Sequence, residues 1–192
     1  MNKYEKLHDK YVALHKLKDK MEKDDSLPLK KGADKLVFGS GNTETKILLI
    51  GEGPGRNEDL QGLPFVGQAG KLLDKFLNLA GLERKNVFIT NIVHHRPPEN
   101  RDPLPNEIEI YGKYLDKIIN IIKPKMIITL GRFSMNKFLP DVFISQVHGK
   151  SFVVGEYIII PMYHPAASLR NGKILEAEKA DFTKLKDMLQ SI

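Results

Sequence analysis

The polar residues whose types and spacing could do chemistry fall in four short segments of the sequence. In the first, GEGPGRNED, three glycines form a tight turn beside three acids, Glu52, Glu58 and Asp59. Such a loop lets the backbone approach a ligand closely, because glycine has no side chain. It is not the dinucleotide fingerprint G-x-G-x-x-G, since Arg56 stands where the third glycine is needed. A nicotinamide or flavin site is therefore disfavoured.

The second segment, QGLPFVGQAG, places Phe65 in a glycine-rich loop that leads into a helix from about Gln68. A phenylalanine in such a loop can offer its face to a nucleic-acid base. It can also fill the core, and periodicity alone favours that second interpretation. The segment is not a phosphate-binding P-loop, because Gln68 occupies the lysine position. Nucleotide hydrolysis is disfavoured for this reason.

The third segment, TNIVHHRPPENRDP, begins at the end of a predicted strand. The side-chain amide of Asn91 offers a donor and an acceptor together, which suits the edge of a pyrimidine, but it could equally cap the turn. The adjacent His94 and His95 suggest a metal site. Neighbouring residues of an extended chain point to opposite sides and seldom share one ion, so we expect no metal here.

The fourth segment, MYHPAASLRN, follows the last predicted strand. His164 should therefore stand at the carboxyl end of that strand. A histidine in this position can donate a hydrogen bond to a developing negative charge, or it can be a structural residue whose hydrogen bonds are satisfied. The residues alone leave both interpretations open.

The elements that must position these segments alternate along the chain. Four short apolar runs predict buried strands, at 46–50, 87–92, 126–130 and 157–161. Apolar periodicity predicts helices around Leu72–Leu79, over 108–122 and from about 177 to 189. Strands that alternate with helices predict an α/β fold, with a parallel sheet covered on both faces and ligands beyond the carboxyl ends of the strands.

An amphipathic helix is predicted at the N-terminus, at about residues 2–22. Its apolar stripe is expected to pack against the rest of the domain, with a partner-binding helix as the alternative; the stripe comprises Tyr4, Leu7, Tyr11, Leu14, Leu17 and Met21.

Length and composition bound the remaining possibilities. The 192 residues, 41% of them hydrophobic, are enough for one domain with a core, which we assign to 1–192. The chain has no cysteine, which excludes disulfides, thiolate nucleophiles and cysteine-bound metal clusters. A net charge of +6 and a pI near 9.3 are compatible with a DNA partner, although a solvated lysine-rich surface explains them as well. No apolar run approaches the roughly 20 residues that span a membrane, so we expect a cytoplasmic protein.

Taken together, the four ordered segments resemble the uracil-DNA glycosylase superfamily, and most closely its family 4, over about Pro28–Leu189. The resemblance implies a three-layer α/β/α sandwich around a four-stranded parallel sheet, with a DNA-binding groove across the strand ends. It also implies a monofunctional enzyme that flips uracil out of DNA and hydrolyses its N-glycosidic bond, leaving an abasic site. A prokaryotic, nucleoid-associated location would follow.

The resemblance also assigns roles around the base. Phe65 would stack on the flipped uracil, Asn91 would bind its polar edge, and His164 would donate to uracil O2 as the base leaves. Gly53 stands where family 1 enzymes have a tyrosine that bars the methyl group of thymine. Exclusion of thymine must then come from elsewhere in this chain.

At the sugar and the DNA backbone, Glu52 and Glu58 would stabilise the cationic sugar and position water, with Asp59 supporting them. Three residues of the histidine segment would contact DNA. Leu169 would fill the gap that the flipped base leaves, Arg170 would lie near phosphate, and Ser168 stands where the family often has a second apolar residue.

The clearest departure from family 4 concerns a metal cluster. That family typically holds a [4Fe–4S] cluster with four cysteines, and the corresponding positions here are Asp24, Leu27, His95 and Tyr111. Such a set cannot hold the cluster in the usual way, so we expect no cofactor. Packing by Leu27 and Tyr111 could take its place.

The expected partner is DNA that contains uracil, bound by a monomer. A sliding clamp or a replication protein is a further candidate partner, and no membrane partner is expected. The alternative function is a catalytically degenerate module that binds uracil or damaged DNA without turnover. An enzyme that bonds covalently to the abasic sugar is disfavoured, because the KRRIH insertion of that branch is absent.

Overall fold

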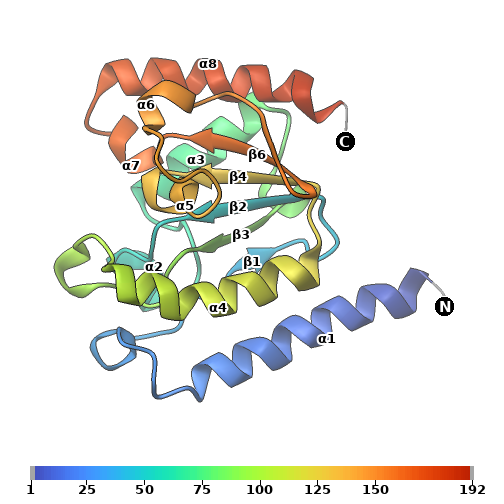
Figure 1. The fold of residues 1–192 in the computed structure, drawn as a ribbon, viewed down its shortest axis with the longest axis vertical. Helices are drawn as coiled ribbons and strands as arrows, with labels where there is room; N and C mark the ends of the chain where they lie inside the picture. The colour runs from blue at the N-terminus through green and yellow to red at the C-terminus, as the bar shows by residue number, and fades with distance from the viewer. Residues whose placement is uncertain (1–2, 191–192) are drawn as a thin grey trace.

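The computed structural model describes residues 3–190, and the side chains of residues 9–190. Its centre is a twisted sheet in the strand order β1-β3-β2-β4-β6-β5 (Figure 1). The strands are β1 (Ser40–Gly41), β2 (Ile47–Gly51), β3 (Phe88–Asn91), β4 (Met126–Leu130), β5 (Phe152–Val154) and β6 (Tyr157–Met162).

The four inner strands β3, β2, β4 and β6 run parallel, as the sequence predicts. The prediction of a four-stranded sheet is wrong in its strand count, because two antiparallel edge strands are added. β1 pairs with β3, and β5 pairs with β6. These edge strands are only two and three residues long, and neither is buried, so they lack the apolar run that marks the inner strands.

Helices cover both faces of the sheet, so the three-layer α/β/α architecture is confirmed (Figure 1). α3 and α8 lie on one face and α4 on the other, with α1 outside α4. The α-helices are α1 (Lys3–Glu22), α2 (Arg56–Gln61), α3 (Gln68–Leu79), α4 (Pro105–Ile122), α5 (Arg132–Asn136), α6 (Ile144–Val147), α7 (Pro165–Ser168) and α8 (Gly172–Leu189). Short 3-10 turns occupy Lys30–Gly32, Arg84–Asn86 and Pro98–Asn100.

The alternating side chains of β2 contribute to two hydrophobic clusters, one on each face of the sheet. Ile47 and Leu49 join the cluster under α3 and α8, whereas Leu48 and Ile50 join the cluster under α4 and α1. Successive side chains of a strand point to opposite faces, so a strand buried on both sides must be apolar throughout. Each large aliphatic side chain buried in this way contributes roughly 1.5–3 kcal/mol.

The helix ends follow local signals. α4 begins at Pro105, three residues before the predicted start, because proline needs no N–H at that position; it ends at Ile122, as predicted. α8 begins at Gly172, five residues before the predicted start near 177. Asn171 sets that start, because its Oδ1 accepts hydrogen bonds from the backbone N–H of Lys173 at 2.9 Å and Ile174 at 3.3 Å.

The N-terminal helix packs through part of its predicted stripe. Leu14, Leu17 and Met21 are buried against the rest of the molecule, whereas Tyr11 is 52% exposed. The side chains of Tyr4 and Leu7 lie outside those that the structure describes. Among the helices of residues 3–190, none is long and apolar enough to cross a membrane.

Candidate active site

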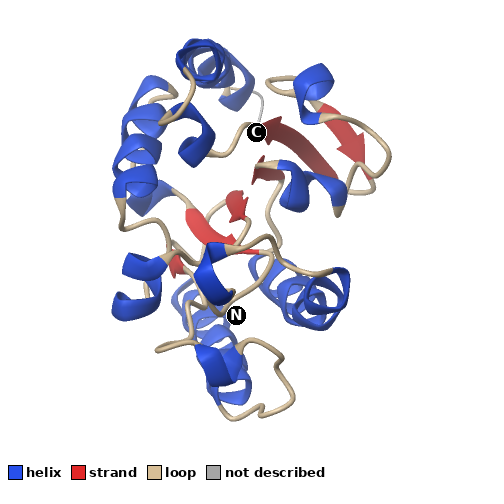
Figure 2. Ribbon diagram, turned by 90° about the vertical axis from the view of Figure 1, so that its left-hand side faces the viewer, coloured by secondary structure: helices blue, strands red, loops and turns tan. Residues whose placement is uncertain are grey.

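A pocket of about 440 Å³ lies where the inner strands end. Figure 2 views the molecule from this side, on which the short helices α2, α5 and α7 follow β2, β4 and β6. The sequence-predicted residues that line the pocket are Glu52, Gly53, Glu58, Phe65, Asn91, His164 and Arg170. Asp59, Ser168 and Leu169 are not among the lining residues.

Strand register brings the pocket together. Gly51 at the end of β2 lies opposite Asn91 at the end of β3, and Leu130 of β4 lies opposite Met162 of β6. Gly51 has to be glycine, since a Cβ atom there would lie 2.4 Å from Asn91 Oδ1 and 2.7 Å from the ring of Phe65. The missing side chain therefore lets the amide and the aromatic ring approach each other.

Asn91 is the least satisfied polar residue of the pocket. Its side chain is 2% exposed, and its Oδ1 has no hydrogen-bond donor among the residues described. A buried acceptor without a partner costs about 1–3 kcal/mol. Because no described backbone N–H reaches Oδ1, the turn-capping interpretation does not apply to this oxygen. The atom is available to a ligand.

His164 is held in one orientation by the backbone. Its Nδ1 accepts a hydrogen bond from the N–H of Ala166 at 3.1 Å, at the start of α7. Burial lowers the pKa of His164 to about 4, although the charge of Glu58 acts in the opposite direction. The imidazole is therefore neutral near pH 7, and the engaged Nδ1 assigns its proton to Nε2.

Phe65 lies in the core, as its periodicity indicates, and it also faces the pocket. It is 6% exposed and belongs to the core cluster under α3, yet it also lines the pocket. Its ring centroid lies 5.6 Å from that of His164, with the two planes inclined by 31°. Its φ of 52° lies in the left-handed region, which a phenylalanine rarely adopts.

The three acids of the first segment separate in space. Glu58 Oε1 accepts hydrogen bonds from the N–H groups of Val66 at 2.9 Å and Gly67 at 2.8 Å, so it holds the loop of Phe65. Asp59 lies outside the pocket, 2% exposed. Its Oδ1 accepts hydrogen bonds from the N–H groups of residues 34 and 35, at 2.9 and 3.2 Å. Glu52 is therefore the acid best placed to act on a ligand.

The environment of Glu52 disfavours its charged form. Burial and, to a lesser extent, the negative charge of Asp102 raise the pKa of Glu52 to about 7, against the opposing charge of Arg132. The carboxyl group thus titrates near neutral pH, where a small change in its surroundings alters its charge.

The histidine segment presents only part of its predicted contacts to solvent. Leu169 is 48% exposed, and Arg170 is exposed at the pocket. Ser168 instead points inward, where it is 4% exposed and its hydroxyl donates to Glu178 of α8. Burial raises the pKa of Glu178 to about 8. The expected contact of Ser168 with DNA is thus replaced by a link between α7 and α8.

The third segment ends in a loop whose polar residues were given no role in the sequence analysis. Asn100, Arg101 and Asp102 line the pocket from this loop, and Asp102 forms an ion pair with Arg132 at the start of α5. Arg101 fixes the loop through a two-pronged contact with Glu107, at 2.9 and 2.6 Å. The available signal was the sequence ENRDP, whose charged residues directly precede the start of α4.

Comparison with models of protein families matches residues 38–190 to the uracil DNA glycosylase superfamily. The chain belongs to this superfamily. The match contains all four segments that carry the pocket, whereas α1 lies outside it.

Curated relatives within the superfamily agree with this assignment. The chain is 45% identical to the type-4 uracil-DNA glycosylase of Sulfurisphaera tokodaii over 162 residues, which are 79% of this chain and 74% of the relative. The type-4 uracil-DNA glycosylase of Saccharolobus solfataricus is 43% identical over 183 residues, 90% of this chain and 85% of the relative. That of Archaeoglobus fulgidus is 44% identical over 162 residues, 79% of this chain and 81% of the relative.

One region sets this member of the superfamily apart from the expected family 4 pattern. Where cysteines would hold an iron–sulfur cluster, we find a set of contacts that we call the tyrosine plug: Asp24, Leu27, His95, Tyr111 and Tyr114. The Tyr111 hydroxyl is hydrogen bonded to His95 Nδ1 at 2.8 Å, and the Tyr114 hydroxyl donates to Asp24 Oδ2 at 2.6 Å. Leu27 and Tyr111 are buried at 2% and 0% exposure.

The tyrosine plug does not fit an iron–sulfur cluster. Its side chains offer no thiolate, and the buried rings and the leucine occupy the interior there. The rings of His94 and His95 both lie beside Tyr111, with centroid distances of 6.0 and 5.8 Å. His94 also lies 3.2 Å from the Thr90 hydroxyl through Nε2, and His95 is hydrogen bonded to the Tyr111 hydroxyl. Across residues 3–190, no group of three potential ligands could hold a metal ion.

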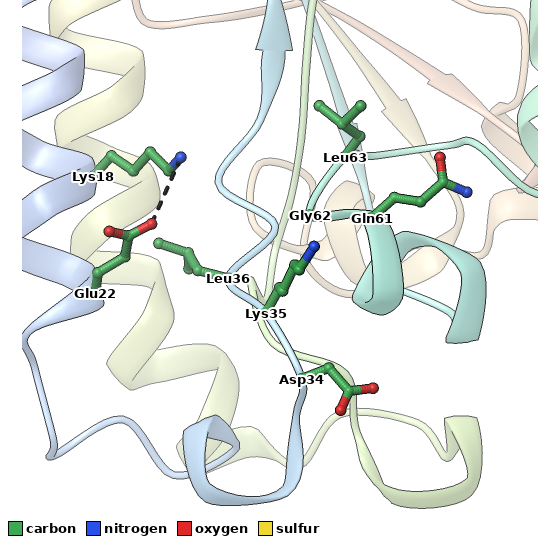
Figure 3. A pocket seen from close by; sticks show the side chains of 8 residues that line it. All are labelled: Lys18, Glu22, Asp34, Lys35, Leu36, Gln61, Gly62 and Leu63. Atoms are coloured by element: carbon green, nitrogen blue, oxygen red, sulfur yellow. Dashed lines mark ion pairs between the residues drawn. The ribbon is translucent and has the colours of Figure 1, made fainter.

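A second hollow of about 540 Å³ lies away from these residues, between α1, the segment 34–36 and the end of α2 (Figure 3). Its wall carries an ion pair between Lys18 and Glu22, with 3.6 Å between Nζ and Oε1. None of the predicted site residues lines this hollow. The predicted site residues thus gather at the pocket beyond the strand ends rather than at this hollow.

Proposed function

We propose that this protein removes uracil from DNA by hydrolysing the bond between the base and deoxyribose, and that it leaves an abasic site. The observation that carries the proposal is the convergence in one pocket of an unpartnered amide oxygen, a neutral histidine and an aromatic ring. The names of the relatives, type-4 uracil-DNA glycosylases, support the same activity.

Recognition of the base would rest on Asn91 and Phe65. Uracil presents an N3–H donor beside the O4 acceptor, and the Asn91 amide can accept from the first and donate to the second. Cytosine offers the opposite pattern at both positions, so it would leave the buried amide unsatisfied. Phe65 would stack on the flipped base. Gly53 lines the same pocket, and a Cβ there would lie 2.8 Å from Val93 Cγ2, so Val93 already crowds that position.

Bond cleavage would use His164 and Glu52. As the bond between C1′ and N1 breaks, its electron pair leaves with uracil, and negative charge develops on O2. The Nε2–H of neutral His164 would donate a hydrogen bond to that oxygen. The positive sugar would be stabilised by the Glu52 carboxylate, which would also position the water that attacks C1′. The hydroxyl group of this water bonds to C1′. Its remaining proton neutralises the uracil anion, so the products are free uracil and an abasic site. Glu58 would support Phe65 rather than touch the sugar.

Contacts to DNA would come from the exposed end of the histidine segment. Leu169 would fill the gap left by the flipped base, and Arg170 would lie near phosphate. No lysine lines the pocket within the described residues, which supports a monofunctional enzyme without a covalent step through an amine. Since one chain supplies the whole pocket, we propose that the protein acts as a monomer.

The test uses labelled oligonucleotides that contain either uracil or thymine at one position, followed by alkali and a denaturing gel. His164→Ala is compared with His15→Ala, a matched change on the exposed surface of α1. We expect cleavage only at uracil, retained in His15→Ala and lost in His164→Ala. Intact DNA together with retained binding would instead support the module that binds without turnover.

A further inference from the structure

The loop that presents Phe65 adopts a conformation that needs support. Phe65 has a φ of 52°, and the loop turns so closely onto α3 that a Cβ at Gly70 would lie 1.8 Å from the carbonyl oxygen of Phe65. A phenylalanine in the left-handed region persists only where its surroundings hold it there. The contacts that hold this loop therefore decide where the ring lies.

One of these contacts comes from outside the pocket. Arg84, in the 3-10 turn after α3, donates from its guanidinium group to the carbonyl oxygens of Pro64 at 3.2 Å, of Phe65, and of Gly70 at 3.5 Å. Its Nε donates to Asp74 Oδ1 of α3 at 2.5 Å. Arg84 is not a lining residue of the pocket, so it reaches Phe65 only through the backbone.

The opposite side of the loop is held by an anion. Glu58 accepts the N–H groups of Val66 and Gly67, which directly follow Phe65. A cation thus binds the carbonyl groups of Pro64 and Phe65, and a carboxylate binds the N–H groups of the two residues that follow. Hydrogen bonds to charged groups are about twice as strong as those between neutral groups. This arrangement fixes the backbone on both sides of Phe65.

We propose that Arg84 is a positioning residue, which holds Phe65 in the orientation needed to stack on the flipped base. This inference rests on the proposed uracil excision. Arginine suits the task because its planar group directs several N–H donors in fixed directions, whereas lysine offers a single ammonium group. The loss of Arg84 should therefore affect the step that depends on the ring and leave the grip on DNA unchanged.

The experiment measures the single-turnover cleavage of a uracil-containing oligonucleotide and, separately, the Kd for an oligonucleotide that carries an abasic-site analogue. Arg84→Ala is expected to lower the cleavage rate about tenfold, within the range of a stacking contact. The Kd for the abasic-site analogue should stay unchanged. Lys85→Ala is the matched control, since Lys85 belongs to the same turn, is 72% exposed at its side chain and forms an ion pair with Glu83.

Two further variants separate positioning from folding. Arg84→Lys keeps a cation beside Asp74 but cannot bridge three carbonyl groups, so it should melt near the wild type and still cleave slowly. In the Phe65→Ala background, Arg84→Ala should cause no additional loss, because residues that act through one contact are not additive. A wild-type rate in Arg84→Lys, or an additive loss in the double variant, would overturn the inference. Failure of the wild type to cut uracil-containing DNA would instead refute the proposed function itself.

Discussion

The pocket contains a buried polar atom without a hydrogen-bond partner in the described part of the chain, whereas the polar groups of the tyrosine plug are hydrogen bonded to one another. In the pocket, Asn91 Oδ1 has no donor among the described residues, and burial raises the pKa of Glu52 to about 7. In the plug, His95 and Tyr111 satisfy each other, and Tyr114 donates to Asp24. The pocket is thus complete only with a ligand, whereas the plug is complete within the chain itself.

This difference assigns the two regions different tasks. An unsatisfied buried group destabilises the free protein, and this free-energy cost is recovered when a ligand supplies the missing hydrogen bond. A satisfied buried pair holds the structure and has nothing left to offer a ligand. The plug ties the segment around Leu27 to α4 and to the loop after β3, and that same loop reaches the pocket through Pro97. The hydrogen-bonded polar groups of the plug and the unpaired polar groups of the pocket are therefore adjacent but separate sets.

The largest expected effect is on cleavage in Asn91→Ala. Removal of the amide should lower the single-turnover rate by about a hundredfold to a thousandfold, since a site built to bind polar groups loses its paired hydrogen bonds. The melting temperature should stay equal or rise, because the unsatisfied oxygen disappears. Asn120→Ala, an exposed change on α4, is the control for both measurements. A clear loss of stability in Asn91→Ala would contradict the comparison.

The reverse pattern is expected for Tyr111→Phe. The variant leaves the buried His95 Nδ1 without its hydroxyl partner, which should lower the free energy of unfolding by about 1–3 kcal/mol in urea titrations. Uracil cleavage at room temperature should change little. Tyr11→Phe makes the same chemical change at a side chain that is half exposed and should leave stability unaltered. Equal stability of the two variants would show that the plug does not hold the fold.

The smallest effect is expected for Asp102→Asn, as a shift in pH dependence. Glu52 is protonated below about pH 7, so a rate that needs its carboxylate falls as the pH decreases through that value. Removal of the negative charge of Asp102 favours ionisation of Glu52 and lowers its pKa. The acidic limb of the rate profile should then move to lower pH, and the rate at pH 6 should rise by about a factor of three.

Asp116→Asn is the control for that profile, because this acid pairs with Lys137 and does not line the pocket. Its profile should coincide with that of the wild type. If Asp102→Asn also leaves the acidic limb in place, Glu52 is not the group that titrates.

The sequence was sufficient for the inner sheet, because strands buried on both faces must be continuous apolar runs. It was also sufficient to place Asn91 and His164 together at one edge, since both follow parallel strands. The sequence could not show which of the three acids of the first segment faces a ligand and which hold the backbone. The Asp59 carboxylate accepts hydrogen bonds from the N–H groups of residues 34 and 35, which lie 25 and 24 positions earlier in the sequence. A contact this distant in sequence cannot be predicted from a local pattern.

Ser168 illustrates the same limit. Its place in the histidine segment suggested a contact with DNA, but the direction of its hydroxyl depends on Glu178, which is buried in the neighbouring helix. Asp102 was overlooked because its relevance depends on Arg132, thirty positions away and at the end of another strand. Side-chain partners of this kind are fixed by packing, which the sequence pattern does not contain.

Phe65 serves both the hydrophobic core and the pocket, and this dual use has an evolutionary consequence. A lineage that no longer needed the activity would still be selected to fold, and folding alone would preserve the buried ring. Selection for folding would not preserve Asn91, since its buried oxygen without a hydrogen-bond donor destabilises the free protein. Among descendants that have lost their catalytic role, the amide should therefore disappear before the phenylalanine does.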